Sequence, residues 1–153
     1  MTAYDELPDD IKINTPPHYN SHPSGIEIIE ITRLLGFALG NAVKYVARHG
    51  EKENALLDLG KGQWYLNDAV DTALLTVPPV AARKLLALAT YDEHSGDPET
   101  GELTGEFYRA VAAFAEPVHY PRRALNALAV LIHAVEQQTP APAEPELELS
   151  LEL

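Results

Sequence analysis

The chain lacks cysteine, has few basic residues and contains no long hydrophobic run. Without cysteine it can form no disulfide scaffold, no thiolate zinc site and no cysteine nucleophile. Its 11 lysines and arginines stand against 23 aspartates and glutamates, which gives a formal net charge of −12. Affinity for a nucleic-acid backbone is built from many Lys and Arg contacts to phosphates. We therefore expect no binding to duplex nucleic acid.

Membrane and export signals are also missing from the sequence. No stretch approaches the ~18 consecutive apolar residues that a membrane span requires. The first 14 residues carry four acids and one lysine, unlike a secretory signal or a basic transit peptide. We expect a soluble cytoplasmic protein with no membrane partner. Its 153 residues are enough for one compact domain.

Part of the acid excess lies at the C-terminal end. Residues 139–153 contain four glutamates, three prolines and no base. Such a composition cannot bury enough apolar surface to offset the entropy of ordering, so we predict a disordered acidic tail. Glu and Leu alternate from Glu146 to Leu153, which leaves open that the tail adds a strand to a partner's sheet.

The segment from Arg33 to Tyr65 has the opposite charge. It holds five bases and three acids, a net charge of +2, so the remaining residues sum to −14. A locally cationic region in an acidic protein suits a small anion, such as the phosphate of a nucleotide. Ordinary salt-bridged helix surface is the alternative.

Helical periodicity and turn residues predict an all-α bundle. Pro16, Pro17 and Pro23 predict an extended N-terminal loop. Ser24 and Glu27 then form a capping-box pattern. We predict helices over residues 26–35, 41–49, 54–75, 80–90, 104–115 and 122–138, with an exposed loop at 92–101. About five to six helices therefore make one domain, residues 1–138, which precedes the tail.

Two of these helices carry a polar stripe beside their apolar face. In the helix over 41–49, which Gly50 follows as a C-terminal cap, the stripe consists of Asn41, Lys44, Tyr45 and Arg48. In the helix over 54–75 it consists of Asp58, Lys61, Tyr65, Asp68 and Thr72. Gly60 and Gly62 flank Lys61, and each costs roughly 1 kcal/mol in a free helix. They indicate close packing of a neighbouring backbone or room for a ligand, with simple tolerance as the alternative.

Motifs that cradle phosphates or carry hydrolytic chemistry are missing. The sequence has no G-x-x-x-x-G-K-[ST], no G-x-G-x-x-G after a strand, no H-E-x-x-H and no G-x-S-x-G. Phosphate binding would have to use side chains and helix ends in place of a glycine-rich loop.

Several short motifs follow one another between residues 16 and 70. They are His18-Tyr19, Gly25-Ile26-Glu27, Gly40-Asn41 with Lys44-Tyr45 and Arg48, Gly50 with Lys52, and Asp58-Leu59 with Lys61 and Trp64-Tyr65-Leu66. This pattern resembles the phage-associated SaV-like family, domain-of-unknown-function family 3310, which includes a small coliphage nucleotide kinase without a Walker motif. The resemblance implies a bacteriophage nucleotide-binding enzyme located in the host cytoplasm. It does not extend to residues 78–153.

Cationic and aromatic side chains of this segment can hold a nucleotide. The candidate catalytic residues are Lys44, Arg48, Lys61 and Asp58. The candidate nucleotide-binding residues are His18, Tyr19, His22, Asn41, Tyr45, Lys52, Trp64 and Tyr65. Core packing is the alternative for the aromatic rings, and we favour it for Trp64. His18 and His22 without a third ligand argue against a zinc site.

Two pairs of carboxylates, each one helical turn apart, suggest a metal. Glu27 and Glu30 form the first pair, and Asp68 and Asp71 form the second. If the two pairs face each other, they can hold Mg²⁺ through oxygen ligands. This layout is similar to that of all-α nucleoside-triphosphate pyrophosphohydrolases. Four solvated surface acids are the alternative.

Three functions are compatible with these residues. The first is a nucleotide kinase that acts on (deoxy)nucleoside monophosphates, in which Lys and Arg hold the phosphates and Mg²⁺ bridges them. The second is a Mg²⁺-dependent nucleotide pyrophosphohydrolase. The third is a non-catalytic module, as a homo-oligomer or otherwise, that sequesters a nucleotide or binds a host protein. The three functions use the same residues, so the sequence does not choose among them.

Overall fold

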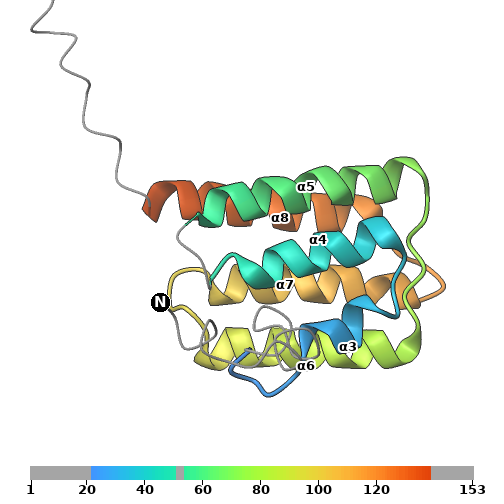
Figure 1. Ribbon diagram of the computed structural model, residues 1–153, viewed down its shortest axis with the longest axis horizontal. Coiled ribbons are helices and arrows are strands. Elements are labelled where there is room, and N and C mark those ends of the chain that lie inside the picture. The colour runs from blue at the N-terminus through green and yellow to red at the C-terminus, as the bar shows by residue number, and fades with distance from the viewer. Residues whose placement is uncertain (1–21, 51–53, 139–153) are drawn as a thin grey trace, which may run out of the picture.

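The computed structural model describes residues 22–50 and 54–138, and within these ranges the protein is all-α (Figure 1). The predicted fold class is therefore confirmed. The helices are α3 (Ile28–Thr32), α4 (Phe37–Arg48), α5 (Ala55–Asp71), α6 (Pro79–Ser95), α7 (Gly101–Ala112) and α8 (Pro121–Gln138). A 3₁₀ turn, η1 (Ala113–Ala115), extends α7.

The ends of α5 follow from local chemistry. The side chain of Asn54 accepts a hydrogen bond from the backbone N–H of Leu57 at 3.1 Å, and so satisfies one free donor of the first turn. At the other end Ala73 has a φ of 57°, in the left-handed region, and the N–H of Leu74 bonds to the carbonyl of Ala69. This reversal ends the helix at Asp71, earlier than the predicted Leu75.

The first two helices differ most from their predicted bounds. α3 has five residues, and Ser24 does not cap it, because its hydroxyl accepts from the N–H of Ile26 and contacts His22. α4 begins at Phe37 and runs through Gly40. A Cβ at Gly40 would lie 3.1 Å from the carbonyl oxygen of Thr32, so glycine lets α4 approach the end of α3. The predicted loop at 92–101 is shorter than expected, because its first four residues belong to α6 and Gly101 begins α7.

The long helices run roughly alongside one another and close into a ring of contacts (Figure 1). α4 packs on α5, α5 on α8, α8 on α7, α7 on α6, and α3 joins α6 to α4. The fully buried side chains inside this ring include Leu39, Val43, Leu59, Leu66, Leu85, Leu88, Phe107, Leu128 and Leu131. In the described part of the chain, no helix is long and apolar enough to cross a membrane.

Ion pairs connect neighbouring helices at the surface of the bundle. Arg109 of α7 donates from Nε to Glu93 of α6 at 2.8 Å. Arg123 of α8 donates from Nε to Glu106 of α7 at 2.7 Å, and this hydrogen bond raises the pKa of Arg123 above its ordinary value. Exposed pairs of this kind add little stability, but they orient adjacent helices.

Candidate functional site

The close contact between α4 and α5 depends on Gly62. A Cβ at this position would lie 3.4 Å from the carbonyl oxygen of Ala42 and 3.4 Å from Cγ2 of Val46. The predicted close packing is thus confirmed for Gly62, whereas Gly60 is exposed and faces open space. The contact places the polar stripes of the two helices side by side. We call the resulting surface the α4–α5 face; it consists of Phe37, Lys44, Tyr45, Arg48, Asp58, Lys61, Trp64 and Tyr65.

Aromatic rings cover the middle of the α4–α5 face. Tyr45 and Tyr65 are stacked, with 5.9 Å between ring centroids and 6° between planes. Phe37 and Trp64 meet Tyr65 edge-on at 5.9 Å and 5.2 Å. Phe37 is 78% exposed and Trp64 is 64% exposed. The expected core packing of Trp64 is therefore wrong, because Trp64 lies on the outward side of α5, between the buried positions Gly62 and Leu66.

Two lysines lie beside the same aromatic ring. The Nζ atom of Lys44 is 4.4 Å from the centroid of the Tyr45 ring, and that of Lys61 is 5.5 Å from it. Both distances are within the range of a cation–π contact. Neither ammonium forms an ion pair with a carboxylate of the described residues. Both charges are therefore available to an anion that approaches the face.

Arg48 and Asp58 form an incomplete pair at the seam of the two helices. The Nε atom of Arg48 is buried and has no hydrogen-bond partner among the described residues, and it lies 4.0 Å from Oδ2 of Asp58, beyond hydrogen-bond distance. Asp58 is only 5% exposed. A buried donor without a partner costs free energy.

Asn41 is only partly available to a ligand. Its Nδ2 donates to the carbonyl oxygen of Phe37 at 2.8 Å. Together with Lys44 and Arg33 it lines a shallow pocket of about 190 Å³ between α3 and α4. A nucleotide that binds Asn41, as predicted, would have to use the Oδ1 atom of its amide.

The four candidate metal ligands do not come together. Glu30 accepts a hydrogen bond from Nζ of Lys84 on α6 at 3.1 Å, whereas Asp68 and Asp71 are exposed near the end of α5. Across residues 22–50 and 54–138, no group of three or more His, Asp or Glu side chains is placed to hold a metal. The predicted site built from Glu27, Glu30, Asp68 and Asp71 is therefore not formed, because α3 packs on α4 and α6 while Asp68 and Asp71 lie on α5.

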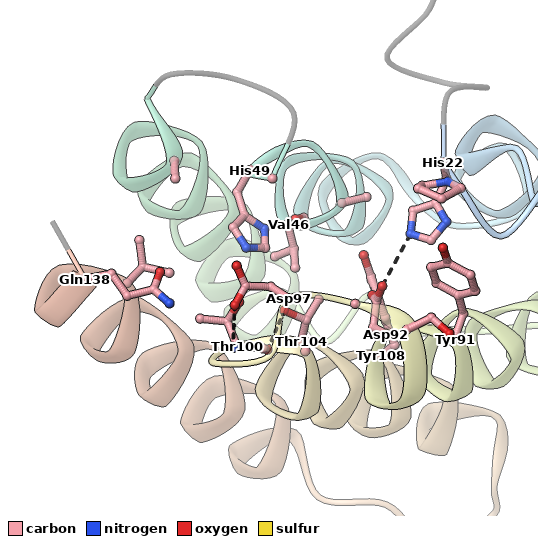
Figure 2. Close-up of a pocket in the computed structure, with 18 residues that line it drawn as sticks. His22, Val46, His49, Tyr91, Asp92, Asp97, Thr100, Thr104, Tyr108 and Gln138 are labelled. Atoms are coloured by element: carbon pink, nitrogen blue, oxygen red, sulfur yellow. Dashed lines mark hydrogen bonds and ion pairs between the residues drawn. The ribbon is translucent and has the colours of Figure 1, made fainter.

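His22 lies in a different place from the other predicted residues. It lines a cavity of about 400 Å³ at one end of the bundle, between the end of α4, the α6–α7 connection and the end of α8 (Figure 2). We call it the end cavity. Asp92, Asp97, Thr100 and Thr104 line it with His49, and none of these was a candidate from the sequence. His18, Tyr19 and Lys52 lie outside the described residues.

One comparison with known proteins gives a match. The model of a protein family of unknown function, DUF3310, matches residues 13–67, which include α3, α4 and most of α5. The match covers every predicted site residue except Asp68 and Asp71. Neither the curated proteins nor the solved structures contain a match to the chain.

Proposed function

We propose that the protein binds a nucleotide on the α4–α5 face. The observation that carries this proposal is the stacked pair of Tyr45 and Tyr65, with the ammonium groups of Lys44 and Lys61 beside the Tyr45 ring. Lysine supplies point charges for phosphates, and exposed aromatic rings stack on bases. Both requirements of a nucleotide are met within one surface of two helices.

The partly buried seam beneath this surface suits the phosphates. The side chain of Arg48 is 23% exposed, and its guanidinium can bind a phosphate oxygen while Asp58 lies 4.0 Å from Nε. Trp64 and Phe37, which are largely exposed, can stack on the base. The nucleotide then lies along the face, with its phosphates toward Arg48 and Lys61.

We propose phosphoryl transfer between nucleotides as the reaction at this face. The motif resemblance to a family that includes a Walker-less nucleotide kinase supports it, as does the gathering of the four catalytic candidates on α4 and α5. Lys44, Arg48 and Lys61 would hold the phosphates in line, and Asp58 would orient the guanidinium. Mg²⁺ would arrive with the nucleotide triphosphate, since the four-carboxylate site is not formed.

Sequestration of a nucleotide without turnover would use the same surface. One assay distinguishes it from phosphoryl transfer. The protein is incubated with Mg·ATP and each deoxynucleoside monophosphate, and diphosphate products are measured by chromatography. We expect a diphosphate with at least one acceptor, and its loss in Lys61→Gln but not in Lys84→Gln, a matched lysine on α6. Tight nucleotide binding with no product for any acceptor would contradict phosphoryl transfer and leave sequestration.

A further inference from the structure

The end cavity has a different chemistry from the α4–α5 face. Among the residues that the structure describes, its lining holds the carboxylates of Asp92 and Asp97 and the imidazoles of His22 and His49, and no lysine or arginine. Its volume, about 400 Å³, is within the range of small-molecule sites, roughly 300–1,000 Å³. A phosphate group would meet the two carboxylates there. The cavity therefore suits a ligand without negative charge.

Hydrogen bonds to Nδ1 favour one tautomer of the neutral His22 ring. Its Nδ1 accepts from the backbone N–H of Ser24 at 3.1 Å and lies 2.7 Å from the Ser24 hydroxyl. The neutral ring therefore carries its proton on Nε2. The edge-on contact with the ring of Tyr91, 5.5 Å between centroids, holds the imidazole in this orientation.

The Nε2–H of His22 faces a carboxylate that it does not reach. Nε2 is 3.6 Å from Oδ1 of Asp92, and no hydrogen bond joins the two groups. The His22 side chain is 9% exposed and that of Asp92 is 13% exposed, so both groups are largely buried at the cavity wall. One donor and one acceptor thus lie side by side at the cavity wall, and no hydrogen bond joins them. Adjacent hydroxyl groups, which both donate and accept, are complementary to this pair.

The other side of the cavity offers acceptors. His49 donates from Nδ1 to the carbonyl oxygen of Val46, so its Nε2 is an acceptor in the neutral ring. Asp97 holds the backbone N–H groups of Glu99 and Thr100 through Oδ1. In Figure 2, His49 and Asp97 lie away from His22 and Tyr91, with Asp92 between them. This arrangement allows a ligand with hydroxyls at one end and a further donor at the other.

We propose that the end cavity binds an uncharged small molecule through a vicinal diol. The two hydroxyls donate to the Asp92 carboxylate and accept from Nε2 of His22, as a carboxylate commonly binds the hydroxyls of a ribose. A donor at the far end of the ligand, such as an amino group, reaches His49 or Asp97. Nucleosides and free sugars both carry this chemistry. The proposal is independent of nucleotide binding at the α4–α5 face.

Three probes test the ligand chemistry on the full chain. Adenosine, 2′,3′-dideoxyadenosine and D-ribose are titrated while backbone amide signals are followed by NMR. We expect adenosine to shift the signals of Gly96 and Gly101, which line the cavity, and the dideoxy analogue to bind roughly tenfold more weakly or less. Ribose that binds as tightly as adenosine identifies free sugars as the source of the diol, and weaker ribose binding identifies nucleosides.

Equal affinity for adenosine and its dideoxy analogue would overturn the proposal, as would an absence of shifts at Gly96 and Gly101. Asp92→Asn tests the protein side, and we expect it to weaken adenosine binding by about tenfold. Asp71→Asn, an exposed aspartate on α5, is the matched control and should leave the affinity unchanged. If Asp92→Asn does not fold, the comparison of ligands on the unaltered chain still decides.

Discussion

The α4–α5 face and the end cavity both use residues of α4, yet they differ in charge and in how the chain builds them. The face comes from two consecutive helices and presents Lys44, Arg48 and Lys61. The cavity comes from segments far apart in the sequence and presents Asp92 and Asp97. Two sides of α4 thus contribute to two surfaces of opposite charge. Substitutions in one surface should change ligand binding there and leave binding at the other unchanged.

Arg48→Met should have the largest effect on the face. Loss of the guanidinium removes a charge-assisted contact worth about 1.5–3 kcal/mol, so nucleotide affinity should fall roughly tenfold or more. It also leaves Asp58 buried without a cation, and the free energy of unfolding should fall. Isothermal calorimetry and urea unfolding measure the two effects.

The double variant Arg48→Met, Asp58→Asn separates binding from stability. Removing both charges should restore much of the free energy of unfolding, because no isolated carboxylate is left in the seam. Nucleotide affinity should stay low. Recovery of affinity in the double variant would show that Arg48 acts only through stability.

Gly62→Leu should disrupt the packing that forms the face. The side chain would meet the backbone of Ala42 and the side chain of Val46, and overpacking of this kind costs about 1–3 kcal/mol. Gly60→Leu, on the exposed side of the same helix, should instead stabilise the protein by up to about 1 kcal/mol. Thermal unfolding compares the two variants, and similar destabilisation by both would contradict the packing at Gly62.

Lys61→Gln should moderately weaken ligand binding at the α4–α5 face and leave binding at the end cavity unchanged. The loss of one exposed charge should weaken nucleotide binding several-fold and reduce its dependence on salt, because the attraction is partly screened. Adenosine binding at the end cavity should not change. Calorimetry at two ionic strengths, with Lys84→Gln as the control, checks both statements; an equal loss in the control would implicate net charge alone.

Trp64→Ala should have the smallest effect on stability. Because Trp64 is 64% exposed, the free energy of unfolding should change by less than about 1 kcal/mol. Trp64 is the only tryptophan of the chain, so its fluorescence reports on the face directly. We expect nucleotide to quench it through stacking, and unchanged fluorescence at saturation would place the base elsewhere.

Local sequence patterns predicted which residues share the α4–α5 face, but they did not predict how exposed those residues are. The spacing of Lys44, Tyr45 and Arg48 defined one stripe, and the helical bundle was predicted from periodicity. The exposure of Trp64 was not predicted, because the sequence does not show which side of a helix lacks a neighbouring element. The start of α4 was missed since the role of Gly40 depends on its contact with α3.

The end cavity could not be predicted from local patterns. Asp92 and Asp97 lie in a segment rich in turn residues, which is typical of an exposed loop. Only the folded bundle brings them to the same cavity as His22 and His49. The prediction of a four-carboxylate metal site was wrong because it, too, depended on contacts between helices that local patterns do not show. Its two pairs have suitable spacing, but the helices that carry them have different neighbours.

The most direct test of nucleotide binding at the α4–α5 face is an NMR titration of the full chain with dTTP, which has no vicinal diol. We predict saturable shifts at the amides of Gly60 and Gly62 and at the indole of Trp64, with Gly96 and Gly101 unchanged. Shifts confined to Gly96 and Gly101, or no shift at millimolar dTTP, would contradict the assignment of the nucleotide site to the α4–α5 face.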